Sequence, residues 1–197
     1  MREVELKSVV PAPDALMSAL LQAGAEPAFA GRLSDRRYDT EDGALASRDL
    51  VLRLRTYANN GGSHSRLEFK GTTRYADTYK VREELGTEVQ DAGVLASMLE
   101  KLGYIVIMEI DRDISQFVFH GATIRVERYP RMDALVEIEG TPATIEAAIV
   151  RTGLPRDGFT SQRLADFVRS FELRTGERAA ICDRELAGDY RYGSADS

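Results

Sequence analysis

Apolar and charged residues alternate along several short segments of this chain, as they do in strands that have one apolar and one charged face. In REVELK, residues 2–7, Val4 and Leu6 occupy one side of such a strand. The other side carries charge only, from Glu3, Glu5 and Lys7. The same test predicts about eight strands, at 3–9, 33–39, 50–57, 65–71, 78–86, 105–119, 122–129 and 134–140, although 105–119 alternates poorly.

Helical spacing occurs in four other stretches, each with a start or stop signal. It predicts helices over 13–23, 91–102, 142–152 and 160–174, and a glycine follows each of them. The loop NNGGSH at 59–64 is typical of a hairpin, so its flanking strands are expected to be antiparallel neighbours. We expect one domain over 1–175 and a C-terminal tail over 176–197, with one short helix followed by disorder.

Charged residues dominate one face of six of the predicted strands. The basic members of this set are Lys7, Arg53, Arg55, Lys70, Lys80, Arg82 and Arg125. The acidic members include Glu3, Glu5, Glu127, Glu137 and Glu139. A sheet with one face in water is the simpler explanation for any one strand. Solvated faces, however, usually mix Thr, Ser, Gln and Lys, whereas these faces consist mainly of Glu and Arg. The pattern therefore predicts an α+β fold in which a closed eight-stranded antiparallel β-barrel turns its charged faces inward and helices flank its apolar exterior.

An inward charged lining indicates a charged ligand, because an ion removed from water costs several kcal/mol unless it is paired or hydrated. The basic side chains can neutralise several phosphates, but the glutamates would repel the same polyanion. A hard divalent cation removes this conflict, since it binds carboxylate oxygens on one side and phosphate oxygens on the other. The lining thus predicts a site for Mg²⁺ or Mn²⁺ and a triphosphate.

Composition narrows the class of protein further. The chain has 197 residues, and its formal net charge of −6 argues against general affinity for nucleic acid or anionic membranes. Cys182 is the single cysteine, which excludes an internal disulfide. The start of the chain lacks an apolar signal segment, and no apolar run reaches the roughly 20 residues of a membrane helix. We expect a cytoplasmic protein with no nucleic-acid or membrane partner; a homodimer is compatible with the sequence.

Six motifs occur in the order found in one known superfamily. They are EVELK at 3–7, DRRYDTEDGAL at 35–45, LRLR at 52–55, LEFKG at 67–71, KVREE at 80–84 and LVEIEG at 135–140. Together they resemble the CYTH superfamily, the triphosphate tunnel metalloenzymes that include class IV adenylyl cyclases, thiamine triphosphatases and inorganic tripolyphosphatases. The likeness covers about residues 1–173.

This resemblance implies roles for individual residues. One or two Mg²⁺ or Mn²⁺ ions are expected near Glu3, Glu5, Glu137 and Glu139. The phosphate-contacting positions of the family correspond to Lys7, Arg53, Arg55, Lys70 and Arg82, and Lys80 and Arg125 agree in position and face. Arg112 is expected to keep one basic contact, although simple alternation puts it on the wrong face unless a bulge intervenes.

The resemblance leaves the reaction open. EVELK is closer to the cyclase branch, which converts ATP to cyclic AMP and pyrophosphate, and this is the preferred expectation. The segments MEIDRDISQF at 108–117 and RVERYPRMDAL at 125–135 lack the Gly-Leu-Gly of the cyclases. An inorganic tripolyphosphatase or a thiamine or nucleoside triphosphatase is the alternative, with ATP, tripolyphosphate or another organic triphosphate as substrate. Glu139 or Glu127 would act as base. A nucleotide- or polyphosphate-binding module without turnover is the non-enzymatic alternative.

Overall fold

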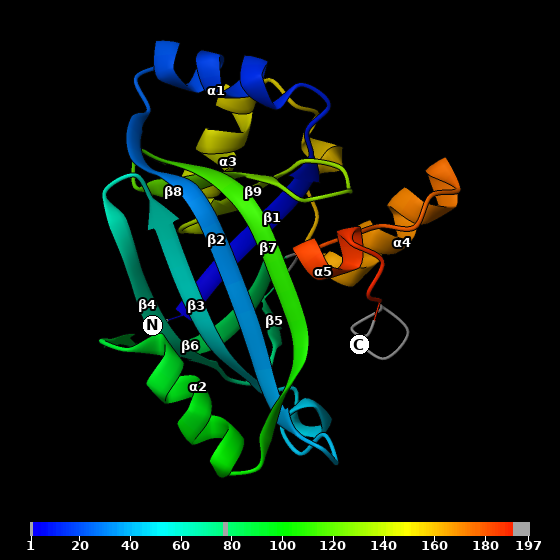
Figure 1. The fold of residues 1–197 in the computed structure, drawn as a ribbon. Coiled ribbons are helices and arrows are strands. Elements are labelled where there is room, and N and C mark those ends of the chain that lie inside the picture. Colours follow the sequence, from blue (N-terminus) through cyan, green and yellow to red (C-terminus); the bar gives the residue numbers. More distant parts are fainter. Residues whose placement is uncertain (1, 77–78, 191–197) are drawn as a thin grey trace.

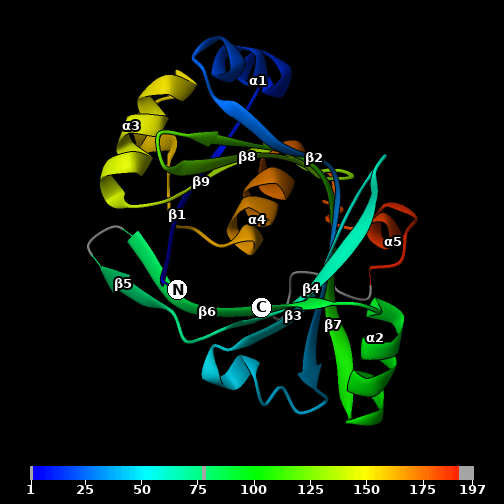
Figure 2. The same cartoon turned by 90° about the vertical axis from the view of Figure 1, so that its left-hand side faces the viewer.

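A computed structural model describes the backbone of residues 2–76 and 79–190 and the side chains of residues 4–75 and 81–190. Within this part of the chain, eight antiparallel strands follow one another around a ring, in the order β1-β9-β8-β7-β2-β3-β4-β6, and β6 pairs with β1 to close it (Figures 1 and 2). The strands are β1 (Arg2–Val9), β2 (Glu26–Thr40), β3 (Val51–Asn59), β4 (Gly62–Lys70), β6 (Tyr79–Val89), β7 (Tyr104–Phe119), β8 (Ala122–Arg128) and β9 (Leu135–Glu139). The predicted closed barrel is confirmed.

Helices flank this barrel, some on its apolar exterior and one across its open side (Figure 2). The described helices are α1 (Pro13–Gln22), α2 (Ala92–Lys101), α3 (Pro142–Thr152), α4 (Leu164–Thr175) and α5 (Asp183–Leu186). The largest apolar cluster lies between β1, β8 and β9 and the helices α1 and α3, where Leu20, Ile124 and Ile145 have no exposed surface. Each such side chain contributes about 1.5–3 kcal/mol by leaving water. A second cluster, around Leu54 and Leu99, fixes α2 on the outside of β3.

Local signals set the ends of these helices. α3 follows a capping box in which Thr141 N donates to Thr144 Oγ1 at 3.0 Å and Thr144 N donates to Thr141 Oγ1 at 3.3 Å. It ends at Gly153, whose φ of 68° is readily adopted only by glycine. α2 is preceded by its N-cap residue Asp91, which accepts a hydrogen bond from Val94 N at 2.9 Å.

The strand bounds differ from the predicted ranges by a few residues, and most of all in β2. β2 begins at Glu26 rather than at residue 33, because the stretch 26–31 pairs with β7 although it lacks alternation. The partners of Arg37 and Tyr38 on β7 are Met108 and Val106, so a bulge at Ile107 interrupts the register. An extra residue turns the following side chains to the other face, which explains the poor alternation of 105–119. A short strand, β5 (Arg74–Ala76), pairs with the outer edge of β6 and was not predicted.

The segment after α4 packs against the barrel beyond the end of β8. Asp111 N donates to Ile181 O at 2.8 Å, and Ala180 and Arg131 exchange two backbone hydrogen bonds of 2.8 and 3.0 Å. The short helix α5 lies in this segment, and residues 191–197 of the tail lie outside the described residues. None of the described helices combines the length and apolar character needed to cross a membrane.

Candidate active site

The inward faces of the strands line one cavity of about 600 Å³. Seven of the predicted substrate-binding residues are in its lining: Lys7, Arg53, Arg55, Lys70, Arg82, Arg112 and Arg125. Three of the predicted acidic residues join them: Glu5, Glu127 and Glu137. The parity of the strands therefore brings these side chains together from seven of the eight strands.

Three other predicted residues are not among the residues that line the described cavity. Glu139 is the last residue of β9; it lies opposite Glu5 in the register and is half-buried, but it is not part of the described cavity lining. Glu3 and Lys80 occupy β1 and β6, where they pair with Arg82 and Glu5 respectively. The side chains of Glu3 and Lys80 lie outside the described part of the structure.

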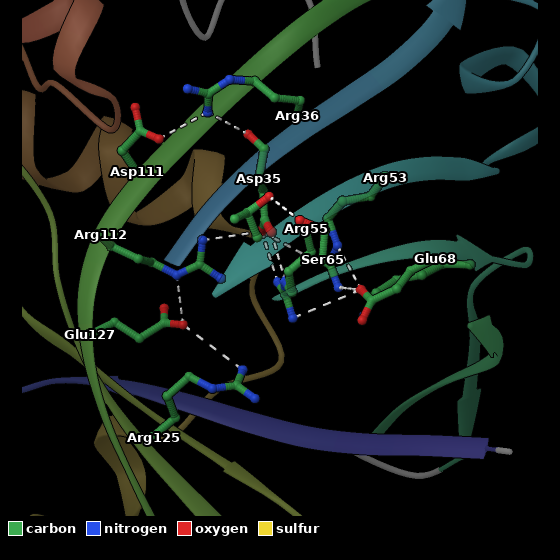
Figure 3. Close-up of polar contacts among 12 residues, drawn as sticks. Asp35, Arg36, Arg53, Arg55, Ser65, Glu68, Asp111, Arg112, Arg125 and Glu127 are labelled. Atoms are coloured by element: carbon green, nitrogen blue, oxygen red, sulfur yellow. Dashed lines mark hydrogen bonds and ion pairs between the residues drawn. The ribbon is translucent and has the colours of Figure 1, made fainter. Parts of the chain in front are cut away.

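Asp35 is the centre of the basic side of the cavity (Figure 3). Its two carboxylate oxygens accept hydrogen bonds from Arg55 Nε and Nη2 at 2.6 and 2.7 Å. The same carboxylate accepts from Arg53 Nη1 at 3.3 Å and from Arg112 Nη1 at 3.1 Å. Asp35 has no exposed surface. Burial alone would raise the pKa of Asp35, but the three guanidinium groups outweigh it and hold that pKa well below 3.8.

Two glutamates extend this network on either side. Arg53 Nε donates to Glu68 Oε2 at 2.9 Å. Arg112 Nε donates to Glu127 Oε1 at 2.9 Å, which places the Arg112 side chain inside the barrel, as the bulge at Ile107 allows. Both oxygens of Glu127 are engaged, since the hydroxyl of Tyr129 donates to Oε2 at 2.5 Å. Burial, followed by the negative charge of Glu127, raises the pKa of Tyr129, so the hydroxyl keeps its proton as a donor.

The acidic side of the cavity lies on β1 and β9. Lys7 Nζ stands between two carboxylates, at 2.7 Å from Glu5 Oε1 and 2.8 Å from Glu137 Oε2. Arg125 Nη1 donates to Glu137 Oε1 at 2.6 Å. Burial would raise the pKa of Glu137, but Lys7 and then Arg125 hold it well below its usual range. Two carboxylates thus face one small position that already accommodates a positive charge.

Comparison with known families finds one match for the chain. The model of the CYTH domain matches residues 1–139. The chain belongs to the CYTH domain family. Because the match ends at the last residue of β9, it covers the eight strands of the barrel and leaves α3, α4 and α5 outside.

Solved structures share the fold of this CYTH protein. A Vibrio parahaemolyticus protein described as a candidate adenylate cyclase superposes with a TM-score of 0.72 and 22% identity, over 85% of this chain and 97% of its own. The PH1819 protein of Pyrococcus horikoshii gives 0.69 and 21%, over 89% and 99%. A Hippeastrum protein described as a candidate adenylyl cyclase with a dominant triphosphatase activity gives 0.60 and 15%, over 89% and 96%. No curated protein matches the chain.

A divalent cation fits the carboxylate pair of the CYTH barrel. Glu5 and Glu137 approach each other from paired strands and offer hard oxygen ligands, as Mg²⁺ and Mn²⁺ prefer. The ammonium group of Lys7 now bridges them, so the position between the two carboxylates suits a cation. Burial would lower the pKa of Lys7, but Glu137 and Glu5 raise it, and the bridging group stays charged.

Two further basic residues are oriented by neighbours on the rim. Arg82 Nε donates to Gly71 O and Arg82 Nη2 to Asp49 O, both at 2.6 Å, so its guanidinium group also holds two loops against the barrel. Lys70 forms an ion pair with Glu84. Both basic side chains line the cavity in addition to making these contacts.

Asp35 and Arg37 line the cavity but were not among the residues predicted from the sequence. Arg37 lies opposite Arg53 on β3 and Met108 on β7, and its buried Nε has no hydrogen-bond partner. Burial, with Arg53 as the largest charged contribution, lowers the pKa of Arg37 to about 10. Applied to DRRYD, the parity test does put residues 35 and 37 on one face, which is the signal that was available in the sequence.

An apolar wall next to these basic residues completes the lining of the cavity. It combines Met108 and Ile110 of β7 with Leu164 and Val168 of α4 and with Ile181. Figure 2 shows α4 lying across the open side of the barrel. The sequence assigned no role to the tail segment, yet residues from 176 to 190 contribute to this lining.

A second cluster of potential metal ligands lies on the outer face of β7. The ligand atoms of Glu109, Asp111 and Cys182 lie within 4.8 Å of one another. Arg36 Nη1 donates to Asp111 Oδ1 at 2.9 Å, and Arg184 Nη1 donates to Glu109 Oε1 at 3.1 Å. Because guanidinium groups already neutralise both carboxylates, we interpret this cluster as the anchor of the tail segment.

Proposed function

We propose that this CYTH protein is a divalent-cation-dependent enzyme that acts on an organic triphosphate, with conversion of ATP to cyclic AMP and pyrophosphate as the preferred reaction. One observation carries this proposal: basic residues exceed acidic ones in an enclosed site of an acidic protein. Ten basic and eight acidic side chains line the described cavity, whereas the whole chain has a net charge of −6. The excess is largest among the residues that the strands contribute, eight basic and four acidic. Such a local excess attracts a polyanion.

In this proposal, the basic residues bind the phosphates and the glutamates bind the metal ion. The arginines, Arg53, Arg55 and Arg112 foremost, present forked donors that match phosphate oxygens, and Lys7 and Lys70 add point charges. Glu5 and Glu137, with Glu3 and Glu139 as further ligands, would hold Mg²⁺ or Mn²⁺. When bound, the cation supplies positive charge to phosphate oxygens. Fixed positive charge and positioning are the main contributions that this site offers to phosphoryl or nucleotidyl transfer.

A base is the remaining requirement of the cyclase reaction, in which the ribose 3′-hydroxyl attacks the α-phosphorus. Of the two expected glutamates, Glu127 is the better placed, because it lines the cavity and Glu139 does not. The bonds from Arg112 and Tyr129 fix the orientation of the Glu127 carboxylate. The apolar wall formed by Met108, Leu164 and Ile181 supports an organic group on the substrate rather than bare tripolyphosphate.

Hydrolysis of the triphosphate is the second candidate. Both tyrosines that line the described cavity already contact guanidinium groups, Tyr129 that of Arg112 at 6.0 Å and Tyr190 that of Arg178 at 3.8 Å. One face of each ring is therefore already engaged, which leaves less aromatic surface for stacking of an adenine. The Hippeastrum protein with the same fold, described as having a dominant triphosphatase activity, also supports this candidate. A binding module without turnover is disfavoured, since an anion binder has little need of the Glu5–Glu137 pair.

Product analysis separates these candidates. The purified protein is incubated with ATP, tripolyphosphate or thiamine triphosphate in Mg²⁺ or Mn²⁺, and the products are resolved by chromatography. Cyclic AMP with pyrophosphate supports the cyclase, and orthophosphate from any of the three supports the hydrolase. Tight binding of ATP without turnover would leave the binding module, and neither binding nor turnover of any triphosphate would contradict the proposal altogether.

Substitution of the carboxylate pair tests the proposed metal site. Glu5→Gln and Glu137→Gln keep the shape of the side chain but remove its charge, so we expect metal-dependent turnover to fall by at least about 100-fold. Glu100→Gln, on the exposed face of α2, is the matched control and should retain wild-type activity. Wild-type rates in both cavity variants, with unchanged thermal unfolding, would remove the metal site from the account.

A further inference from the structure

Arg37 differs from every other basic residue that the strands contribute to the described cavity. Lys7, Lys70, Arg53, Arg55, Arg82, Arg112 and Arg125 each have a carboxylate within ion-pair distance. Arg37 has none among the described residues, and its Nε is buried without a hydrogen-bond partner. Arg37 is half-buried, and its Nε has therefore lost contact with water without gaining a partner among the described residues.

The surroundings of Arg37 make this position more unfavourable. Arg53 lies directly opposite on β3, and Met108 lies opposite on β7. Asp35, two residues earlier on the same face, is already bonded to Arg53, Arg55 and Arg112. A half-buried guanidinium group that lies next to other arginines and has no carboxylate partner among the described residues is unfavourable. A bound anion would therefore gain an ion pair here without displacing an existing one.

Topology separates Arg37 from the proposed metal position. Glu5 and Lys7 are on β1, and Arg37 is on β2, which is the fourth strand from β1 in either direction around the ring. The two groups thus face the cavity from opposite walls of the barrel. A chain of phosphates that extends across the cavity from the Glu5–Glu137 pair would therefore bring its other end toward β2.

We propose that Arg37 binds the phosphoryl group farthest from the Glu5–Glu137 pair, and that it thereby sets a preference for triphosphates over diphosphates. This inference rests on the proposed function, because it takes the cavity to be a polyphosphate site. A diphosphate held at the carboxylate pair is one phosphoryl group shorter and leaves Arg37 unpaired. A triphosphate supplies the missing partner and gains a charge-assisted hydrogen bond.

Calorimetric titration of the full-length protein with inorganic tripolyphosphate and with pyrophosphate, both in Ca²⁺, measures this preference. For Arg37→Gln we expect affinity for tripolyphosphate to fall about 10- to 100-fold, as for the loss of one hydrogen bond between charged groups. Affinity for pyrophosphate should change less than about threefold. Arg37→Lys should recover part of the loss, because it restores the charge without the fork.

Thermal unfolding of the protein without ligand distinguishes a binding role from a structural one. If Arg37 had a structural role, its substitution would lower the unfolding temperature. Arg37→Gln and Arg37→Met should unfold no lower than wild type, because they remove an unpaired charge. Arg36→Gln is the matched control for binding: it is the neighbouring residue on the other face, bonded to Asp111, and should keep the wild-type ratio of the two affinities.

The possible outcomes test the inference about Arg37 and the proposed function separately. If wild type binds tripolyphosphate and Arg37→Gln binds it equally well, the inference is wrong and the proposed function stands. Equal losses for tripolyphosphate and pyrophosphate would also overturn it, since Arg37 would then not distinguish chain length. A large drop in thermal stability with unchanged affinities would make Arg37 structural. If wild type binds neither anion, the proposed function fails together with the inference.

Discussion

Both faces of the β2–β7 strand pair carry aspartates and arginines, but the charges are balanced on the outer face and unbalanced on the inner one. On the inner face, Asp35 and Arg112 belong to the cavity network, and on the outer face their chain neighbours Arg36 and Asp111 bind each other at 2.9 Å (Figure 3). Inside, one aspartate serves three arginines, and Arg37 has no acidic partner among the described residues. Outside, the carboxylates and guanidinium groups are matched.

The difference between these faces lies in charge balance and enclosure. The outer pairs satisfy one another and close against the tail segment, so nothing more is needed for their stability. The inner groups surround a cavity of about 600 Å³ and keep an excess of positive charge. Alternation along a strand identifies a charged face, but only the balance of charge around a closed space indicates that the face binds a ligand.

The largest effect is expected from removal of the inner aspartate. Asp35→Ala leaves three buried guanidinium groups without their common acceptor, and the free energy of unfolding should fall by about 3–5 kcal/mol. On the outer face, Asp111→Ala should cost only about 1–2 kcal/mol, because Arg36 is one-third exposed and can be hydrated instead. Urea unfolding measures the loss of unfolding free energy in both variants. Equal losses would show that the two faces do not differ as described.

Acid should weaken the inner network in a defined direction. The pKa of Asp35 is lower in the folded protein than its ordinary value of 3.8, so its contribution is present above that value and is lost as the pH falls through the folded pKa. The stability of wild type should therefore decline more steeply with falling pH than that of Asp35→Asn, from about pH 5 downward. Urea unfolding at several pH values tests this, and parallel curves for the two proteins would contradict it.

The sequence predicted the barrel well because parity is a local property of strands. Val4 and Leu6 face the helices and Glu5 and Lys7 face the cavity, as alternation requires. Glu139 shares the face of Glu137, but it ends β9 and lies outside the cavity lining; position along a strand is not contained in parity.

Other parts of the site could not be predicted from short segments of the sequence, because they depend on contacts between distant segments or on which face of a strand points inward. The face of Arg112 required the bulge at Ile107, which depends on pairing with β2. Parity does put Asp35 and Arg37 on one face, but Arg36 gives the other face a charge as well, so polarity alone did not show which face points inward. The apolar wall requires α4 and Ile181 to dock on β7, a contact between segments far apart in the chain.

A smaller effect is expected at the exposed edge of the outer cluster. Arg184 is about one-third exposed, and its bond to Glu109 should contribute no more than about 1 kcal/mol. Arg184→Ala should therefore lower the free energy of unfolding by about 0.5–1 kcal/mol and leave triphosphate turnover within about twofold of wild type. A loss of turnover beyond tenfold would mean that the outer cluster takes part in the chemistry.

The smallest effect concerns the thiol at the same anchor. Cys182 has no exposed surface, and burial raises the pKa of its thiol, so it should react slowly with a disulfide reagent in the folded protein. In Arg184→Ala the labelling rate should rise about two- to fivefold, in line with a loss of 0.5–1 kcal/mol of local stability. An unchanged rate would show that Arg184 does not hold the tail segment against the barrel.

The most direct measurement is a crystal structure of the protein grown with Mn²⁺ and a non-hydrolysable ATP analogue, with anomalous diffraction data to locate the manganese. The account predicts an anomalous peak beside Glu5 and Glu137 and phosphate oxygens within hydrogen-bond distance of Arg53 and Arg55. A peak at Glu109 and Asp111 on the outer face, or an analogue bound outside the barrel, would contradict it.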